Sequence, residues 1–375
     1  MDGDNNLSDA ALQNISDMSA AGAAERVQVI IQVDLPQGIT TKRYRMVNGG
    51  WTILSDLGEL DMASSQTLTD FLSWAKGAYP ADRTVLVLWD HGNGWDQGDG
   101  PSSPASKIRS MFNDQDNGDQ HFLPNHQIKK AIMASGLSVD LLGIDACTMG
   151  TIETLYEFRD IAPVIVSSEE ETPDRGWIYR SVLSNLFSNP DMSVEDLARV
   201  VVGSFQSYYE TVFYPAQSGD FDRRYTISAV RSRYLTLIAQ EVDRLAGNLM
   251  VRLADSSTQA ETISLITNAR VGVQAIDRYI QPNVYVDLTD LDSRLGQGTD
   301  IAALVSAATI AEYHGSGRPN AHGISIVFFP SRQSPTYDPN YKNYDPQTNT
   351  GNDGDFINDF RWDEFLEDYY VSAGL

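Results

Sequence analysis

Residues 84–92, Thr-Val-Leu-Val-Leu-Trp-Asp-His-Gly, and residues 139–147, Val-Asp-Leu-Leu-Gly-Ile-Asp-Ala-Cys, decide how this chain of 375 residues folds. Each is an apolar run of strand length that ends in a reactive side chain, His91 in the first and Cys147, the only cysteine, in the second. The carboxyl ends of neighbouring parallel strands meet at one edge of a sheet, where binding sites gather. If the two runs are neighbouring strands, we expect the imidazole and the thiol to meet there, as in a cysteine–histidine hydrolase.

The segments around these two runs alternate between strand and helix patterns. Short runs rich in β-branched and other apolar residues predict strands at residues 26–34, 42–47, 84–89, 141–144 and 163–167. Apolar residues at helical spacing predict helices between them, at residues 68–79, 124–134 and 149–158. This alternation predicts an α/β fold with a mainly parallel sheet that helices flank on both faces.

The composition changes near residue 220, where we place a soft domain boundary. Residues 1–220 then form the core, and residues 221–375 form a mostly helical C-terminal region that returns one strand, residues 322–330, to the core. Amphipathic patterns predict the helices of the second half of the chain at residues 193–214, 229–254, 301–313 and 356–370. Residues 96–106, rich in Gly, Pro and Ser, predict a surface loop.

The charge balance and the single cysteine narrow the class of protein. The chain has 51 acidic and 27 basic residues, a net charge of −24, which argues against binding nucleic acid or an anionic membrane through a broad surface. This charge is compatible with a basic substrate, although solubility is the simpler explanation. One cysteine excludes an internal disulfide framework. No apolar run is long enough for a membrane span, and the polar opening, residues 1–7, is not that of a signal peptide.

The nucleophile expected from this arrangement is the thiolate of Cys147. The residue follows a strand and precedes the helix predicted from Met149, and the N–H groups and dipole at a helix start stabilise an anion. We expect His91 to hold or take the thiol proton, and the backbone N–H groups of Gly92 and Cys147 to be oxyanion donors. The alternative is that Cys147 is a small buried apolar residue and His91 a turn residue. Two matched strand endings, each with a small residue beside the reactive one, favour the catalytic interpretation.

Further motifs carry a resemblance to a known family. Along the chain stand Asp2-Gly-Asp-Asn-Asn-Leu7, His91-Gly-Asn-Gly-Trp95, Asp145-Ala-Cys-Thr-Met-Gly150, Ser168-Glu-Glu-Glu-Thr-Pro173, Gly176-Trp177 and His322-Gly-Ile-Ser-Ile326. With these motifs in this order, the chain resembles the clostripain family of cysteine peptidases, in the clan of caspases, legumains and gingipains. The resemblance covers most of the chain. It implies a caspase-like catalytic core over residues 1–220, a Cys147–His91 dyad, and cleavage of protein or peptide substrates after Arg or Lys.

Asp145 is the residue that the resemblance connects with specificity. On a strand, its side chain points to the same face as that of Cys147, two residues later. A carboxylate there would close a pocket for a guanidinium or ammonium group, whereas the alternative is a cap on the following helix. Asp174 is a second candidate wall of the pocket. The resemblance also implies that Ser168 and Trp177 belong to the substrate-binding residues.

The loop between the two catalytic strands is the expected site of self-cleavage. The resemblance implies a zymogen that cuts itself, and Lys107 and Arg109 are the only basic residues between His91 and Lys129. They follow a stretch rich in Gly, Pro and Ser, where an extended backbone can enter an active site. We favour Lys107, because residues 108–112 resemble the start of a strand. A surface loop that is never cut is the alternative.

No metal site is expected. The acidic segment 113–119, Asn-Asp-Gln-Asp-Asn-Gly-Asp, fails the spacing of a calcium loop, so we interpret it as a solvated turn. Calcium stays a possibility through the resemblance, because some family members use it. The histidines other than His91 show no ligand spacing, which argues against zinc. We therefore expect no required cofactor.

Two other functions stay open. A catalytically silent caspase-like binding module is one, although intact His91, Cys147 and Asp145 speak against it. The other is a cysteine peptidase of the same fold that cleaves after Asp or Asn, which the carboxylate of Asp145 disfavours. The resemblance implies a secreted or periplasmic bacterial protein, and we expect it to be a monomer.

Overall fold

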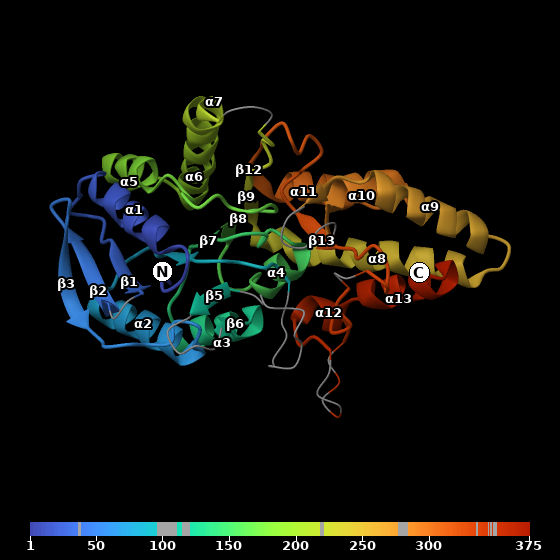
Figure 1. The fold of residues 1–375 in the computed structure, drawn as a ribbon, viewed down its shortest axis with the longest axis horizontal. Coiled ribbons are helices and arrows are strands. Elements are labelled where there is room, and N and C mark those ends of the chain that lie inside the picture. Colours follow the sequence, from blue (N-terminus) through green and yellow to red (C-terminus); the bar gives the residue numbers. More distant parts are fainter. Residues whose placement is uncertain are drawn as a thin grey trace.

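A five-stranded sheet lies at the centre of the molecule (Figure 1). In the computed structural model, the described residues are 1–36, 39–95, 111–114, 121–217, 221–276, 284–334, 337–343, 345, 347 and 351–375. The strand order is β12-β9-β8-β7-β4, formed by β4 (Val85–Trp89), β7 (Leu141–Asp145), β8 (Val164–Ser167), β9 (Thr226–Arg231) and β12 (Thr309–His314). Strands β4, β7 and β8 run parallel, whereas β9 and β12 are antiparallel additions. The predicted α/β fold is confirmed.

Helices cover both faces of this sheet, which explains why its strands read as continuous apolar runs. Along β7, Leu142 and Ile144 enter one buried apolar cluster and Leu141 enters the other. The first cluster is closed by α2 (Ser65–Ala78), α3 (Asn125–Ser135), α4 (Ile152–Glu157), α8 (Leu235–Ala254) and α11 (Ile301–Ala308). The second is closed by α1 (Ser8–Ser19), α5 (Tyr179–Ser188) and α6 (Val194–Tyr208).

A smaller antiparallel sheet lies at one end of the molecule (Figure 1), formed by β1 (Ile30–Leu35), β2 (Ile39–Val47) and β3 (Gly50–Asp56). Residues 1–3 lie between β1 and β4 and hydrogen-bond to both of them. The N–H of Asp2 donates to the carbonyl oxygen of Trp89 (3.2 Å), and the N–H of Gly3 donates to that of Asp34 (3.0 Å). The start of the chain is thereby held beside β4, which ends at the candidate site.

Two helices predicted in the C-terminal half are in part strands. The pattern at residues 229–254 divides into the end of β9 and α8, and the pattern at residues 301–313 divides into α11 and β12. Strand β9 pairs with β8 and with β12, so contacts between distant segments override the local helical pattern. The strand expected at residues 322–330 is shorter than predicted and does not join the central sheet. It is β13 (Ser325–Val327), which pairs with β11 (Tyr285–Asp287) in a separate sheet.

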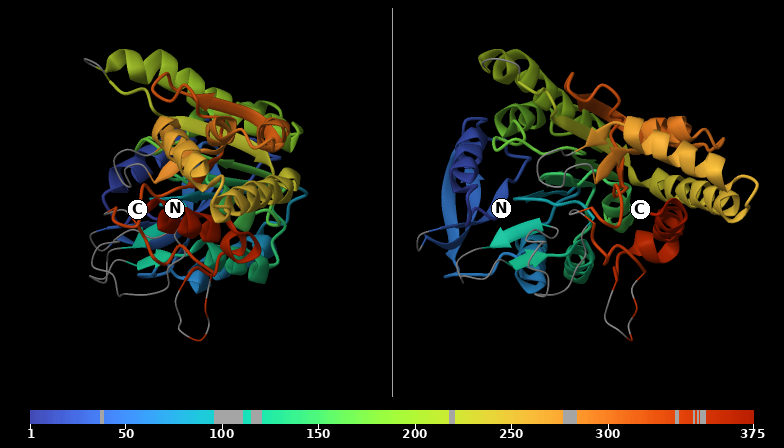
Figure 2. Two further views of the ribbon diagram at one scale, coloured as in Figure 1. Left: turned by 90° about the vertical axis from the view of Figure 1, so that its right-hand side faces the viewer. Right: turned by 45° about the vertical axis from the view of Figure 1, so that its right-hand side comes forward.

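Both apolar clusters contain residues from the two halves of the chain, so the soft boundary near residue 220 does not separate two cores. The first apolar cluster runs from Ala63 to Tyr370. Helices α8, α9 (Gln259–Gly272) and α13 (Trp362–Ala373) extend away from the small sheet (Figures 1 and 2). The remaining elements are short: β5 (Met111–Asp114), β6 (His121–Leu123), a π-helical turn (Tyr209–Phe213), α7 (Tyr214–Ala216), a 3₁₀ turn (Ser232–Tyr234), β10 (Ala275–Ile276), α10 (Leu288–Leu295) and α12 (Asp355–Asp359).

Candidate active site

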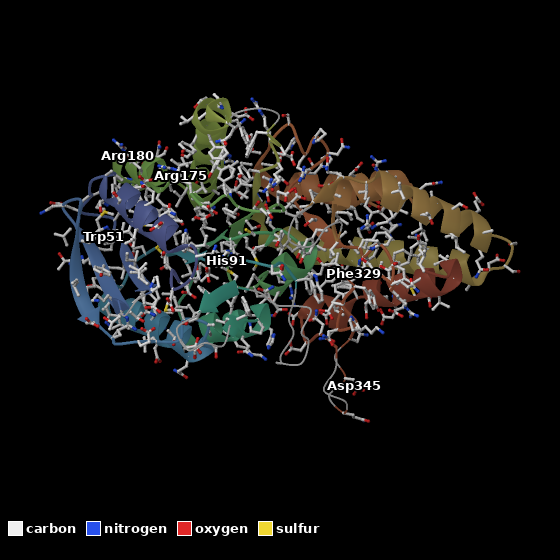
Figure 3. All side chains as sticks on the ribbon, viewed as in Figure 1. Trp51, His91, Arg175, Arg180, Phe329 and Asp345 are labelled. Carbon is white, nitrogen blue, oxygen red and sulfur yellow. The ribbon has the colours of Figure 1, made fainter. Side chains whose placement is uncertain are left out.

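The register of β4 and β7 brings His91 and Cys147 to neighbouring positions. Trp89 pairs with Asp145 in the parallel ladder, and each reactive residue follows its strand by two positions. The two strand ends are in close contact, because a Cβ atom placed on Gly92 would lie 2.5 Å from the carbonyl oxygen of Cys147. A glycine is thus required at residue 92 by backbone packing alone. Figure 3 shows His91 near the centre of the view.

The thiol of Cys147 is partly exposed and lies against the backbone of Thr172. The N–H of Thr172 donates to Sγ (3.3 Å), and its hydroxyl donates to the carbonyl oxygen of Ala146 (3.0 Å). The predicted helix start behind the thiol is wrong, because α4 begins at Ile152. A helix dipole acts only within about one turn. The N–H of Thr172 is placed to stabilise a thiolate, whereas the carbonyl oxygen of Thr172, 3.7 Å from Sγ, accepts a hydrogen bond from the protonated thiol.

The chain turns sharply after the thiol. Thr148 has a φ of 56°, a left-handed conformation that is strained for a β-branched residue. The turn is held by the loop after β8: the N–H of Thr148 donates to the carbonyl oxygen of Glu170 (3.1 Å), and that of Gly150 donates to Ser168 (2.7 Å). The surrounding structure therefore imposes the bend that presents Cys147.

The loop that carries His91 is anchored by the C-terminal half and by α3. The Tyr285 hydroxyl donates to the carbonyl oxygen of Asn93 (2.7 Å), and the side-chain amide of Asn125 donates to that of Gly94 (2.8 Å). On the other side of the loop, Nε2 of His91 lies 2.8 Å from Oδ1 of Asn6. Sequence reasoning placed Asn6 and Thr172 in motifs but assigned neither a role at the site, since both reach it only through tertiary contacts.

Asp145 is the last residue of β7, two positions before Cys147, and is 3% exposed. Its Oδ2 accepts hydrogen bonds from the N–H of Trp177 (3.1 Å) and the hydroxyl of Tyr179 (2.8 Å). Within the described part of the chain, Oδ1 has no hydrogen-bond partner. Burial raises the pKa of Asp145 from 3.8 to about 7, against the effect of its two hydrogen bonds. Burial therefore favours the neutral carboxyl group more strongly here than in an exposed aspartate.

The turn before Trp177 closes over this carboxyl group. Gly176 has a φ of 58°, and a Cβ atom on it would lie 2.6 Å from Oδ2 of Asp145, so no side chain fits there. The alternative that Asp145 caps the following helix is wrong. Thr151 caps α4, since its hydroxyl oxygen accepts from the N–H of Thr154 (3.2 Å).

The other predicted binding residues lie around the same loop. Ser168 is buried, and its hydroxyl donates to the carbonyl oxygen of Thr226 (2.7 Å) in the sheet. The indole of Trp177 is buried over Gly143, and Asp174 is exposed. The two candidate cleavage residues, Lys107 and Arg109, lie outside the described residues.

The loop after β8 is tied to the C-terminal half by a buried ion pair. Nε of Arg318 lies 2.6 Å from Oε2 of Glu170, and the two side chains are 1% and 0% exposed. A second pair joins Glu171 to Arg224. Because Glu170 also supplies the carbonyl oxygen that holds Thr148, these pairs connect the C-terminal half to the turn at Cys147.

We expect Arg318→Met to destabilise the protein by about 3 kcal/mol, because it leaves the carboxylate of Glu170 buried without its cation. The matched control is Arg199→Met, which removes surface pairs of Arg199 (side chain 47% exposed) with Asp196 and Glu195 and should cost less than about 1 kcal/mol. Urea unfolding at pH 7 measures both. Equal effects of the two changes would contradict the role of the buried pair.

Among the described residues, no three His, Cys, Asp or Glu side chains are arranged to hold a metal ion. None of their helices combines the length and the apolar character that a membrane span requires.

Comparisons with known proteins agree on one family. Residues 1–369 match the clostripain family, Peptidase C11. Clostripain of Hathewaya histolytica is 28% identical over 143 residues, which are 37% of this chain and 27% of that protein, so the matched part spans about a quarter of clostripain.

Two solved structures share the fold. A secreted C11 cysteine protease from Bacteroides thetaiotaomicron, bound to an irreversible peptide inhibitor, is 19% identical over 88% of this chain and 91% of its own, with a TM-score of 0.69. An inactive zymogen C11 protease from Parabacteroides distasonis is 22% identical over 87% of this chain and 89% of its own, with a TM-score of 0.64. The chain belongs to the clostripain family of cysteine peptidases.

Proposed function

We propose that this protein is an endopeptidase that cleaves peptide bonds after Arg or Lys, with Cys147 as the nucleophile and His91 as the acid and base. The observation that supports the proposal is the register of β4 and β7, in which Trp89 pairs with Asp145, so that His91 and Cys147 each follow the end of a neighbouring strand by two residues. Membership of the clostripain family supports the same chemistry.

In the proposed reaction, these groups act in the following order. The thiolate of Cys147 attacks the substrate carbonyl carbon, and the N–H groups of Gly92 and Cys147 are the proposed donors to the oxyanion. The C–N bond breaks as the imidazolium of His91 gives its proton to the leaving amine. Water then attacks the acyl-enzyme, its proton passes to His91, and the thiolate is released. This chemistry needs no cofactor, so we propose that calcium is not required.

The specificity proposal depends on Asp145. Its Oδ1, which has no hydrogen-bond partner among the described residues, is the acceptor we assign to the guanidinium or ammonium group of the substrate. The carboxyl group is covered by the turn at Gly176, so substrate entry requires that turn to move. Asp174, exposed on the same loop, would add negative charge at the entrance. Trp177 and Ser168 would contribute by holding Asp145 and the loop in place.

A peptide panel tests the proposed function. Fluorogenic peptides that differ only in the residue before the cleaved bond should be cut after Arg and Lys by the wild type, and not by Cys147→Ala. Cleavage after Asp or Asn would establish the alternative specificity. A folded wild type that cuts no peptide, before or after processing, would favour the silent binding module.

The preference for an Arg substrate over its uncharged analogue should increase with pH, because Asp145 ionises. Its carboxyl group, with a pKa of about 7, is neutral at low pH and pairs with a cation only when ionised. We expect the ratio of kcat/KM for an Arg substrate to that for its uncharged citrulline analogue to rise from pH 5 and to level off above pH 8, by about tenfold or more. The ratio cancels the titration of Cys147 and His91. A ratio that does not change with pH would contradict the assignment.

We further propose that the chain is a zymogen that cuts itself after Lys107, or else after Arg109. The Parabacteroides distasonis structure is that of an inactive zymogen, which supports the proposal. Purified wild type should yield two fragments that meet within residues 96–112, whereas Cys147→Ala should stay intact. N-terminal sequencing of the second fragment identifies the bond. A chain that is fully active while uncut would contradict the zymogen.

The location of the protein is inferred from proteins with a similar structure. A neighbouring structure is that of a secreted protease, and we infer that this bacterial-type peptidase also works outside the cytoplasm on protein or peptide substrates. We expect it to be a monomer, which size-exclusion chromatography with light scattering would test.

A further inference from the structure

The segment before α1 reaches the catalytic histidine. Oδ1 of Asn6 lies 2.8 Å from Nε2 of His91, a normal hydrogen-bond distance. An amide oxygen only accepts, so the hydrogen bond requires a proton on Nε2. In the neutral ring the lone pair is then on Nδ1, the nitrogen left to exchange a proton with Cys147 and the substrate.

The structure fixes this segment with several contacts. The side-chain amide of Asn5 donates to Oδ1 of Asp90 (2.9 Å), next to His91, and its oxygen accepts from the N–H of Leu7 (2.8 Å). Farther back, the N–H of Asp2 donates to Trp89, the last residue of β4. These hydrogen bonds fix the segment to Trp89 and Asp90, the two residues before His91. They thereby fix the position of Asn6 beside the imidazole.

Helix capping does not explain this asparagine. Helix α1 begins at Ser8, and no side chain caps its first turn. Asn6 is exposed, whereas Asn5 beside it is buried and makes the contacts that hold the loop. The contact with His91 is therefore the feature that distinguishes Asn6 from its neighbour.

We propose that Asn6 is a positioning residue that holds His91 in the rotamer and tautomer needed for catalysis. The proposal rests on the proposed function of Cys147 and His91. The amide holds the ring without adding a charge near the carboxyl groups of Asp2 and Asp4, in the same segment, and of Asp90, next to His91. In the thiolate–imidazolium pair, Nε2–H still donates to Asn6, so the amide stabilises the ion pair as well as the neutral tautomer.

The test compares Asn6→Ala, Asn6→Asp and, as a matched control in the same part of the chain, Gln13→Ala. Gln13 is exposed on α1 and hydrogen-bonds to Asp17 (3.0 Å). Two measurements are made: kcat and KM on an Arg peptide, and the rate of alkylation by iodoacetamide from pH 4 to 10. Because the chain has a single cysteine, alkylation reports the ionisation of Cys147 alone.

We expect Asn6→Ala to lower kcat by about 10- to 100-fold, the value of one hydrogen bond to a charged group, with KM within about twofold. Its alkylation profile should shift to higher pH, since the imidazolium partner of the thiolate is less stable. Asn6→Asp should recover most of kcat and move the alkaline limit of kcat upward, because a carboxylate raises the pKa of the imidazole. Gln13→Ala should behave as the wild type.

Other outcomes overturn the proposal. An Asn6→Ala variant with kcat within threefold of the wild type would do so. A loss of kcat with an unchanged alkylation profile would also do so, since it would show a structural role only. If Asn6→Ala fails to fold, Asn6→Asp decides, because an unshifted pH profile in that variant contradicts positioning. A wild type that cuts no peptide refutes the proposed function, while the alkylation profiles still test the coupling of Asn6 to the thiol.

Discussion

Cys147→Ala and His91→Ala are each expected to reduce kcat/KM for peptide cleavage by about 10⁴-fold or more, because covalent thiol catalysis and proton transfer to the leaving amine fail together. The two losses should be similar, and the double variant should be no worse than either single variant. This non-additivity is expected because the two groups act as one unit.

Chemical modification gives an independent measurement of the same prediction. The chain has one cysteine, and its thiol is partly exposed, so iodoacetamide should modify a single site and abolish activity in proportion to the modified fraction. Mass spectrometry counts the adduct. Residual cleavage by fully alkylated protein, or a His91→Ala variant within tenfold of the wild type, would show that this pair does not carry the reaction.

Asp145→Asn is expected to lower kcat/KM for Arg and Lys substrates by about 10³-fold, since the substrate cation then enters the pocket without a counter-charge. The fold should be retained. Asparagine keeps an oxygen that accepts from the N–H of Trp177 and the hydroxyl of Tyr179. It also removes a charge whose burial is unfavourable, as the raised pKa of Asp145 shows, so thermal stability at pH 8 should stay equal or increase.

The matched control is Asp174→Asn, the same change at an exposed carboxylate of the neighbouring loop. We expect a loss of about tenfold or less there, because solvent screens an exposed charge. Steady-state kinetics on Arg and citrulline peptides, with thermal unfolding of each variant, provide the comparison. If Asp145→Asn turned over Arg substrates within about threefold of the wild type, a difference below 1 kcal/mol, Asp145 would not be the pocket carboxylate.

Local sequence was enough to predict the strands that carry the chemistry. Strands β7 and β8 are short apolar runs that are buried along their whole length, and β4 is a similar run that is buried except at Val85 and Val87. Their pattern does not depend on which segment covers them. The predicted neighbours β4 and β7 pair in parallel, with Trp89 opposite Asp145. Strand alternation also predicts that Asp145 and Cys147 share a face, and this stays a prediction because β7 ends at Asp145, two residues before Cys147.

Local sequence patterns did not predict the antiparallel strands β9 and β12. Residues 309–313 continue the apolar spacing of α11, yet they form most of β12, because their partners in β9 lie some eighty residues earlier in the chain. Hydrogen bonding to a distant strand outweighs a local helical preference of less than about 1 kcal/mol per residue.

The sequence by itself determined the α/β class and the candidate site residues His91, Cys147 and Asp145. Only the tertiary structure decided what surrounds them. The N–H of Thr172 donates to the thiol, and Oδ1 of Asn6 lies within hydrogen-bond distance of the imidazole. The turn at Gly176 covers the carboxyl group of Asp145, and burial raises the pKa of that group. The physical reason is that strand patterns come from short-range side-chain periodicity, whereas protonation and orientation depend on atoms a few ångströms away that the chain brings in from distant positions.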